Sequence, residues 1–208
     1  MSAVATAPES VTPAPAAAVP GERLYRLSVE QYHEIAKHGI LTSKDKVVLI
    51  RGLLVKKMTK HRPHTLATGL TRVALERIVP TGWYVDAQEP ISFQDSEPEP
   101  DISVIRGERR QYAHSQPKAK DAGMLVEVSE DSLAEDRTVQ LELFAEGRIP
   151  VYWIVNLVDR QVEVYTEPSG PVANPSYARK QVFRENDSVP VVLDGVEVGR
   201  LAVRDLLP

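Results

Sequence analysis

The segment from residue 124 to residue 166 constrains the fold most, because it alternates apolar strands with one helix. The runs "MLVEVS" and "VYWIVN" are short, apolar and rich in β-branched residues. Between them, "SLAEDRTVQLELFAEG" predicts a helix that Gly147 closes, and "QVEVYT" predicts a hairpin with "VYWIVN" around Asp159 and Arg160. A strand, a helix and a strand followed by a hairpin indicate an α/β or α+β fold, with helices on the faces of a mixed sheet.

The chain before this segment shows the same mixture of helices and hairpins. Ser28 and Gln31 match a capping box at the start of a short helix, and Gly39 suits its end. The stretch "KVVLIRGLLVKKM" predicts a hairpin that turns at Arg51 and Gly52. A second helix is expected over "HTLATGLTRVALERIVP", stopped by the segment 80–82. Its predicted apolar face comprises Leu66, Leu70, Val73 and Ile78.

Further strands are expected at "WYVDAQ", "ISF" and "DISVI", with loops rich in proline and charge between them. The last β-rich piece, "VPVVLDGVEVGRLAVRDLLP", contains a turn at Asp194 and Gly195 and is expected to add edge strands to the same domain. The length of 208 residues suits one domain over residues 21–208, in which 170–208 form a C-terminal β extension. Residues 1–20, rich in Ala and Pro, predict a disordered tail.

Composition excludes several classes of site. The chain has no cysteine, which excludes disulfides, thiolate metal sites and a cysteine nucleophile and favours a cytoplasmic location. No apolar run approaches 18 residues and no secretion signal is present, so we expect no membrane association. The formal net charge of -4 argues against a globally basic nucleic-acid-binding surface but allows a local basic patch.

Asp101 and Glu127 are the candidate site residues that the pattern identifies. Asp101 ends the acidic stretch "QDSEPEPD" and begins a strand, whereas the earlier acids of that stretch predict a solvated approach that Pro98 and Pro100 keep extended. Glu127 interrupts an apolar strand, where burying an unpaired carboxylate costs several kcal/mol. Two carboxylates on adjacent strands would suit Mg²⁺. Strand alternation also permits the simpler interpretation that Glu127 points to solvent.

Four stretches in this order resemble the Uma2 family of endonucleases, within the PD-(D/E)XK superfamily. They are "VLIRGLLVKKM", "SEPEPDISVIRG", "MLVEVSEDSLAEDR" and "LFAEGRIPVYWIVNLVDRQVEVYTEP". The resemblance implies a restriction-endonuclease-like core, a DNA substrate and a homodimer. It also implies that Asp101 and Glu127 bind Mg²⁺ or Mn²⁺, with the carbonyl of Val128 as a further ligand. The position of the family's catalytic lysine, four residues after Asp136, is occupied here by Gln140.

The sequence departs from the family pattern in a second place. Relatives often carry acids in the early hairpin where this chain has Val48 and Arg51. A neutral Gln140 can hold water but supplies no positive charge to a developing phosphate charge. Two functions therefore stay open: a Mg²⁺-dependent endodeoxyribonuclease with Asp101, Glu127 and Gln140 in its catalytic site, and a nuclease-fold module that binds DNA or protein without cleaving. A structural or oligomer-forming domain is a third possibility.

The run "KKMTKHR" supplies candidate DNA contacts. Lys57, Lys60 and Arg62 could contact phosphates, although such a run is also typical of a solvated face. His64 matches a family histidine that could reach the cleft, or could merely pack at the start of its helix.

Other polar and aromatic residues have structural interpretations. Ser132 and Asp136 predict a helix cap, and Gln140 lies one turn beyond Asp136 on the same face. Tyr152 and Trp153 predict core or interface packing.

Overall fold

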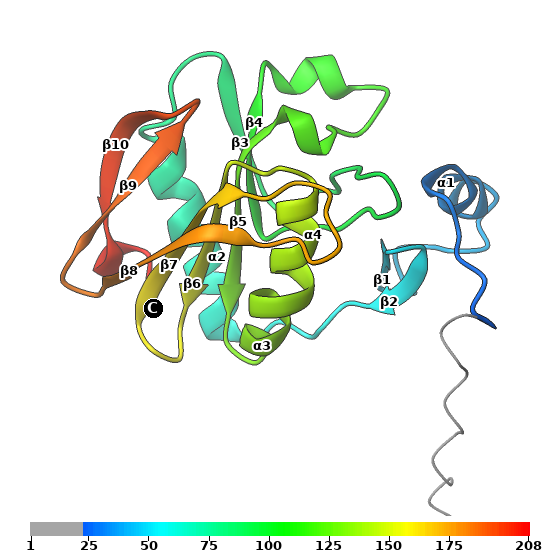
Figure 1. Cartoon of the computed structure of the whole chain (residues 1–208), viewed down its shortest axis with the longest axis horizontal. Coiled ribbons are helices and arrows are strands. Elements are labelled where there is room, and N and C mark those ends of the chain that lie inside the picture. Colours follow the sequence, from blue (N-terminus) through cyan, green and yellow to red (C-terminus); the bar gives the residue numbers. More distant parts are fainter. Residues whose placement is uncertain (1–22) are drawn as a thin grey trace, which may run out of the picture.

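The computed structural model describes residues 23–208, and its centre is a six-stranded mixed sheet (Figure 1). The strand order is β3-β4-β5-β6-β7-β8, in which only β5 and β6 pair in parallel. The parallel pair is the predicted strand, helix and strand unit, so the predicted mixed α+β architecture is confirmed. The six strands are β3 Trp83–Asp86, β4 Ile102–Arg106, β5 Ala122–Ser129, β6 Val151–Asn156, β7 Gln161–Pro168 and β8 Tyr177–Arg184.

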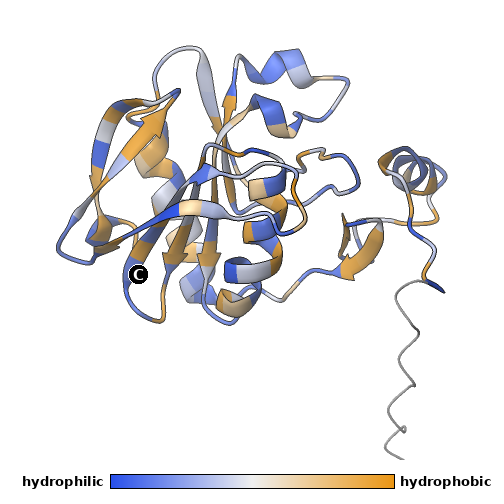
Figure 2. Cartoon of the chain, in the orientation of Figure 1, coloured by the Kyte–Doolittle hydropathy of each residue, from blue (hydrophilic) through white to orange (hydrophobic). Residues whose placement is uncertain are grey.

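Both faces of the sheet are covered, as the apolar colouring of its strands indicates (Figure 2). Along β5, Val126 and Val128 belong to one hydrophobic cluster and Leu125 to the other, because successive side chains of a strand point to opposite faces. Tyr152 and Trp153 are fully buried on opposite faces, which confirms the predicted packing role. A side chain on β5 therefore has no route to solvent except at the end of the strand.

The helix between β5 and β6 covers one face of the sheet. It consists of α3 Leu133–Glu135, a π-helical turn Asp136–Gln140 and α4 Leu141–Glu146, and Gly147 caps it as predicted. The π turn was not predicted; such turns insert an extra residue into a helix and occur often at functional sites. Arg137, within this turn, donates hydrogen bonds to the fully buried Glu163 of β7 and thereby fixes the turn to the sheet.

The N-terminal elements lie on the side of the sheet that α4 covers (Figure 1). They are α1 Val29–Lys37, β1 Val47–Ile50 and β2 Leu53–Lys56. Ser28 and Gln31 form the predicted capping box, and Gly39 follows the helix with a φ of 70°. Arg51 and Gly52 form the predicted turn with φ values of 49° and 74°, a conformation that favours glycine. A Cβ on Gly52 would lie 2.6 Å from the Cβ of Arg26.

Helix α2, Arg62–Glu76, covers the other face of the sheet, but with a different side from the one predicted. The prediction was wrong for Leu66 and Val73, which are 44% and 45% exposed, whereas the predicted Ile78 packs partly buried against the core. Most of the buried side chains of α2 are small or polar, and Ala67 and Leu75 belong to the hydrophobic cluster. The buried residues of α2 are His64, Ala67, Thr68, Thr71 and Leu75.

The C-terminal prediction was also partly wrong. β9 Ser188–Leu193 and β10 Val196–Ala202 form a separate two-stranded sheet around the Asp194–Gly195 turn, while the earlier β8 is the edge strand of the main sheet. Val189 and Val191 pack into the same cluster as α2, so this hairpin covers a face instead of extending an edge. The run "ISF" makes only an isolated bridge, from Ser92 to Lys118. Short 3₁₀ helices occur at Arg109–Tyr112, Ala119–Asp121 and Val203–Asp205.

Two further predictions concern the ends of the chain and the membrane. The predicted disordered tail, residues 1–20, lies outside the described residues. Within residues 23–208, no helix is long and apolar enough to span a bilayer.

Candidate active site

Asp101 and Glu127 meet at the end of the paired strands β4 and β5. Asp101 directly precedes β4 and is 3% exposed, and Glu127 lies on β5 and is 7% exposed. The backbone N–H of Asp101 donates to Oε2 of Glu127 at 3.2 Å, and the N–H of Val128 donates to Oδ2 of Asp101 at 2.9 Å. The alternative in which Glu127 points to solvent is therefore wrong, because the helix after β5 covers that face of the sheet.

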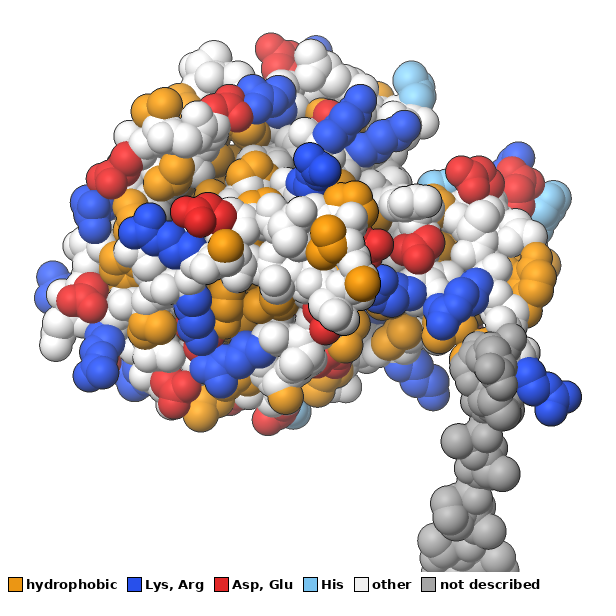
Figure 3. Space-filling view, in the orientation of Figure 1, with side chains coloured by type: hydrophobic (Ala, Val, Ile, Leu, Met, Phe, Trp, Pro, Cys, Tyr) orange, Lys and Arg blue, Asp and Glu red, His pale blue; other side chains and the backbone are white. Residues whose placement is uncertain are grey.

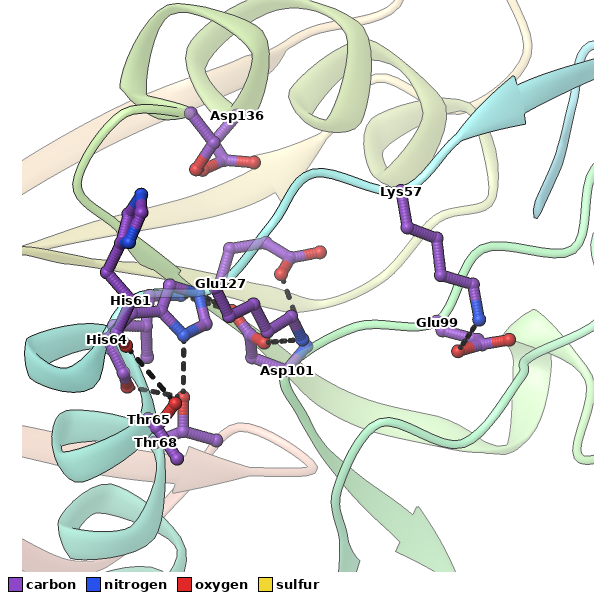
Figure 4. Close-up of polar contacts among 12 residues, drawn as sticks. Lys57, His61, His64, Thr65, Thr68, Glu99, Asp101, Glu127 and Asp136 are labelled. Carbon is purple, nitrogen blue, oxygen red and sulfur yellow. Dashed lines mark hydrogen bonds and ion pairs between the residues drawn. The ribbon is translucent and has the colours of Figure 1, made fainter. Parts of the chain in front are cut away.

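Two basic side chains from the segment before and within α2 contact Asp101. Lys60 Nζ lies 2.6 Å from Oδ1 of Asp101. His64 Nε2 lies 3.0 Å from Oδ2 of Asp101, and both of these residues are labelled in Figure 4. Burial alone would raise the pKa of Asp101, but the hydrogen bonds and charges of His64 and Lys60 outweigh it and lower the pKa. Asp101 is thus held as a carboxylate.

For Glu127, the effects that raise the pKa outweigh those that lower it. Its burial raises the pKa of the carboxyl group well above the ordinary value, and the nearby negative charges of Asp101 and Asp136 raise it further. The hydrogen bond from the Asp101 N–H and the charge of Lys60 act against this rise without cancelling it. A cation beside Glu127 would relieve the cost of its ionised form.

Asp136 is a third buried acid at the same place, on the π turn. Ser129 and Ser132 each donate a hydroxyl hydrogen bond of 2.6 Å to its Oδ2. Burial raises the pKa of Asp136 to about 6, although these two hydrogen bonds lower it. The predicted capping role is wrong for both residues, because the Ser132 side chain caps no backbone N–H and Asp136 is buried. The spacing of Ser129, Ser132 and Asp136 could have indicated this cluster.

Gln140 and Asp136 line the same pocket, as the helical spacing predicted. Among the residues that the structure describes, Oε1 of Gln140 has no hydrogen-bond partner although it is buried. The same holds for Oε2 of Glu130, which also lines the pocket. Neither residue can supply positive charge, so the helix side of the pocket is neutral or acidic.

The pocket has a volume of about 140 Å³ and collects most of the predicted site residues. Arg62 and Val128 are absent from its lining, and Arg51 pairs instead with Glu146 at 2.9 Å. Lys57 pairs with Glu99 at 2.5 Å, apart from Asp101 (Figure 4). The residues singled out from the sequence that line the pocket are Val48, Lys57, Lys60, His64, Asp101, Glu127 and Gln140. The pocket is also lined by Glu130, Glu135 and Asp136, for which the sequence predicted no place in the site.

The acidic approach to Asp101 is only partly solvated. Asp95 is exposed as predicted, but Glu97 is 5% exposed and accepts hydrogen bonds from Ser92 and His33. The prediction was wrong for Glu97, because its carboxylate joins α1 to the loop before β4. Glu99 is partly buried and paired with Lys57.

The donor set fits a hard divalent cation. Within residues 23–208, no three histidine or acidic side chains are grouped so that they could hold a metal ion alone. Mg²⁺ and Mn²⁺ need fewer protein ligands, since Mg²⁺ is commonly bound by one or two carboxylates together with water and substrate phosphate oxygens. The adjacent carboxylates of Asp101 and Glu127 meet that requirement.

Comparisons with known proteins identify a family and a similar fold. Residues 29–204 match the sequence model of Uma2, described as "Putative restriction endonuclease". No curated protein matches the chain in sequence. The fold is similar to that of a crystal structure from Anabaena variabilis described as "a putative nuclease belonging to DUF820". The TM-score is 0.64 at 15% identity, and the match covers 86% of this chain and 97% of that one.

Proposed function

This chain belongs to the Uma2 family, and from this premise we propose that it is a metal-dependent endonuclease that hydrolyses DNA phosphodiester bonds. The observation that carries the proposal is that two buried acids, Asp101 and Glu127, line one pocket. The Asp101 N–H donates to Oε2 of Glu127, and both side chains are less than one tenth exposed. Lys60 offsets the charge of Asp101, but the pKa of Glu127 stays raised, so its ionised form remains costly without a further cation. The pair therefore favours a binding site over a structural role.

In the proposed reaction, Asp101 and Glu127 hold Mg²⁺ or Mn²⁺, which supplies Lewis acidity and activates water when bound. The carbonyl of Val128 is a proposed further ligand. Hydrolysis forms one bond from a water oxygen to phosphorus while the bond from phosphorus to one sugar oxygen breaks, and that oxygen takes up a proton.

The residues of the chain prepare this step. The Val128 N–H and His64 orient the Asp101 carboxylate, and the amide of Gln140 can hold a water molecule in the pocket. Asp136, with its pKa of about 6, can accept the proton that the water loses at neutral pH.

The wider predictions belong to this proposal. Lys57, Lys60, Arg62 and His64 are proposed to face the DNA. A homodimer is proposed from the family resemblance, and a cytoplasmic location from the absence of cysteine. Figure 3 shows basic and acidic side chains interspersed over the face that it draws, so DNA contact would depend on local groups instead of a broad basic surface.

A second candidate function is a nuclease-fold module that binds DNA or protein without cleaving. This function is favoured because both carboxylate oxygens of Asp101 already have partners in the structure. Lys60 contacts Oδ1, and His64 and the Val128 N–H contact Oδ2. Neutral Gln140 and apolar Val48 also line the pocket, where each supplies no charge. This module would retain DNA in a gel-shift assay without cutting it, and Gln140→Lys would add no activity.

Plasmid nicking distinguishes these functions. We expect the wild-type protein with Mg²⁺ or Mn²⁺ to convert supercoiled plasmid to the nicked form, and Asp101→Asn to reduce the rate by at least about 100-fold. Asp95→Asn is the matched control, because Asp95 lies in the same loop but is exposed. Equal nicking by all three proteins, or none by the wild type, would contradict the endonuclease proposal.

A further inference from the structure

Three buried acids line the pocket, and their negative charge repels an anionic phosphodiester substrate. Asp101, Glu127 and Asp136 are all at least nine tenths buried, and the helix that supplies Asp136 offers only the neutral Gln140. Hydrolysis adds negative charge to a phosphate that already carries one, so a positively charged side chain near phosphorus stabilises the transition state. The residue that supplies this charge has to come from another wall of the pocket.

Of the lysines that line the pocket, Lys60 is the one paired with the buried acids. Its Nζ lies 2.6 Å from Oδ1 of Asp101, whereas Lys57 is paired with Glu99. Lys60 lies between β2 and α2, outside regular secondary structure, and its side chain is 37% exposed. One end of this side chain therefore reaches the carboxylates while the rest remains accessible to a ligand entering from solvent.

We infer that Lys60 is a catalytic residue that supplies the positive charge which the helix side of the pocket lacks. This inference rests on the proposed nuclease function. Its ammonium group leaves Asp101 and contacts a non-bridging oxygen of the scissile phosphate, which frees Oδ1 of Asp101. A lysine side chain can make this change by rotation of its four-carbon stem, without movement of the backbone.

A cleavage assay tests the inference first. We expect Lys60→Met to lower the rate of Mn²⁺-dependent plasmid nicking by about 100-fold or more, as for loss of one charge-stabilising donor. Lys37→Met is the matched control, because Lys37 also pairs with a carboxylate, at 3.0 Å from Glu34, but on the remote helix α1. The double variant Lys60→Met with Gln140→Lys should regain activity, since it returns a charge to the pocket from the helix. Thermal unfolding checks that each variant is folded.

A binding assay keeps the inference testable if the wild type does not cut. Fluorescence anisotropy of a short DNA duplex is measured in Ca²⁺, an ion chosen to allow binding without cleavage. Lys60→Met should weaken binding more than Lys37→Met and reduce the slope of log affinity against log salt by about one, as expected for one lost phosphate contact.

The two assays separate the possible failures. Nicking by Lys60→Met at the wild-type rate overturns the role of Lys60 while the nuclease function stands. Absence of wild-type nicking, with binding that depends on Lys60, overturns the nuclease function while the phosphate contact stands. Absence of nicking with equal binding by Lys60→Met and Lys37→Met, or with no binding at all, overturns both.

Discussion

At the scale of single residues, the three buried pocket acids differ in pKa because their neighbours differ. Asp101 keeps a lowered pKa because Lys60 and His64 contact it, whereas burial raises the pKa of Glu127 and of Asp136. An acid with a raised pKa in the folded state stabilises the protein at low pH, and this contribution is lost as the pH rises through the folded-state pKa. Glu127 and Asp136 therefore lower stability at neutral pH, when no cation is bound.

The substitution Asp136→Asn tests whether the raised pKa of Asp136 lowers stability at neutral pH. The pKa rises from 3.8 to about 6, so the cost of Asp136 is absent below about pH 4 and complete above about pH 6. Two pKa units correspond to about 3 kcal/mol, which is the largest expected gain in the free energy of unfolding of Asp136→Asn over wild type at pH 7. Urea unfolding of both proteins at several pH values measures the difference. A difference that stays constant from pH 4 to pH 7 would contradict the raised pKa.

At the scale of elements, helix α2 carries both packing and site residues. His64 in its first turn contacts Asp101, and Leu75 in its last turn is fully buried against the sheet. Packing at one end of the helix thus fixes the position of the histidine at the other end. Because the face of α2 differs from the predicted one, its large apolar residues contribute unequally to stability.

Two leucine substitutions on α2 measure this inequality. Leu75→Ala removes a fully buried side chain and should lower the free energy of unfolding by about 3 kcal/mol. Leu66→Ala, at a position that is 44% exposed, should change it by less than about 1 kcal/mol. Denaturant unfolding with unchanged m-values gives both numbers. Similar losses for the two variants would show that the face predicted from the sequence is buried after all.

Local signals explain which elements the sequence could predict. The Ser28 and Gln31 capping box and the Arg51–Gly52 turn depend on neighbouring residues, and both are present in the structure. The buried face of α2 consists mainly of small and polar residues, so the spacing of its large apolar residues does not identify it. The β9–β10 hairpin forms a separate sheet because it covers apolar residues of α2 and of the main sheet. Which surface is left to cover is a property of the assembled fold, so the sequence of the hairpin alone does not show it.

The sequence also identified part of the candidate site and missed the rest. Asp101 and Glu127 could be identified as a pair because Asp101 begins one apolar strand and Glu127 interrupts another. Lys60 could not be placed, since it reaches Asp101 across 41 residues of chain from an irregular segment. The sequence predicts a helix cap for Asp136, but in the structure this residue begins a π turn and lines the pocket. Such a turn has no recognised signature in a single sequence.

At the scale of the whole molecule, the pocket lies where three parts of the fold meet. The β1–β2 hairpin contributes Val48, α2 contributes His64 and the helix after β5 contributes Asp136 and Gln140 around the ends of β4 and β5. Hydrophobic contacts on both faces of the sheet hold these parts, so the site acids can be buried at a cost that the remaining core offsets. The fold thereby preserves an electrostatically unfavourable cluster that a cation and a phosphate could use.

The most direct test of the central claim is the rate of plasmid nicking as Mn²⁺ is titrated, with wild type and Glu127→Gln compared. The isosteric change removes one negative charge and keeps an oxygen that can accept the Asp101 N–H. Wild type is predicted to nick with a saturable dependence on Mn²⁺ that a chelator abolishes, and Glu127→Gln to be slower by at least about 100-fold at every concentration. Nicking that needs no added metal, or that Glu127→Gln performs as fast as wild type, would contradict a metal site built from Asp101 and Glu127.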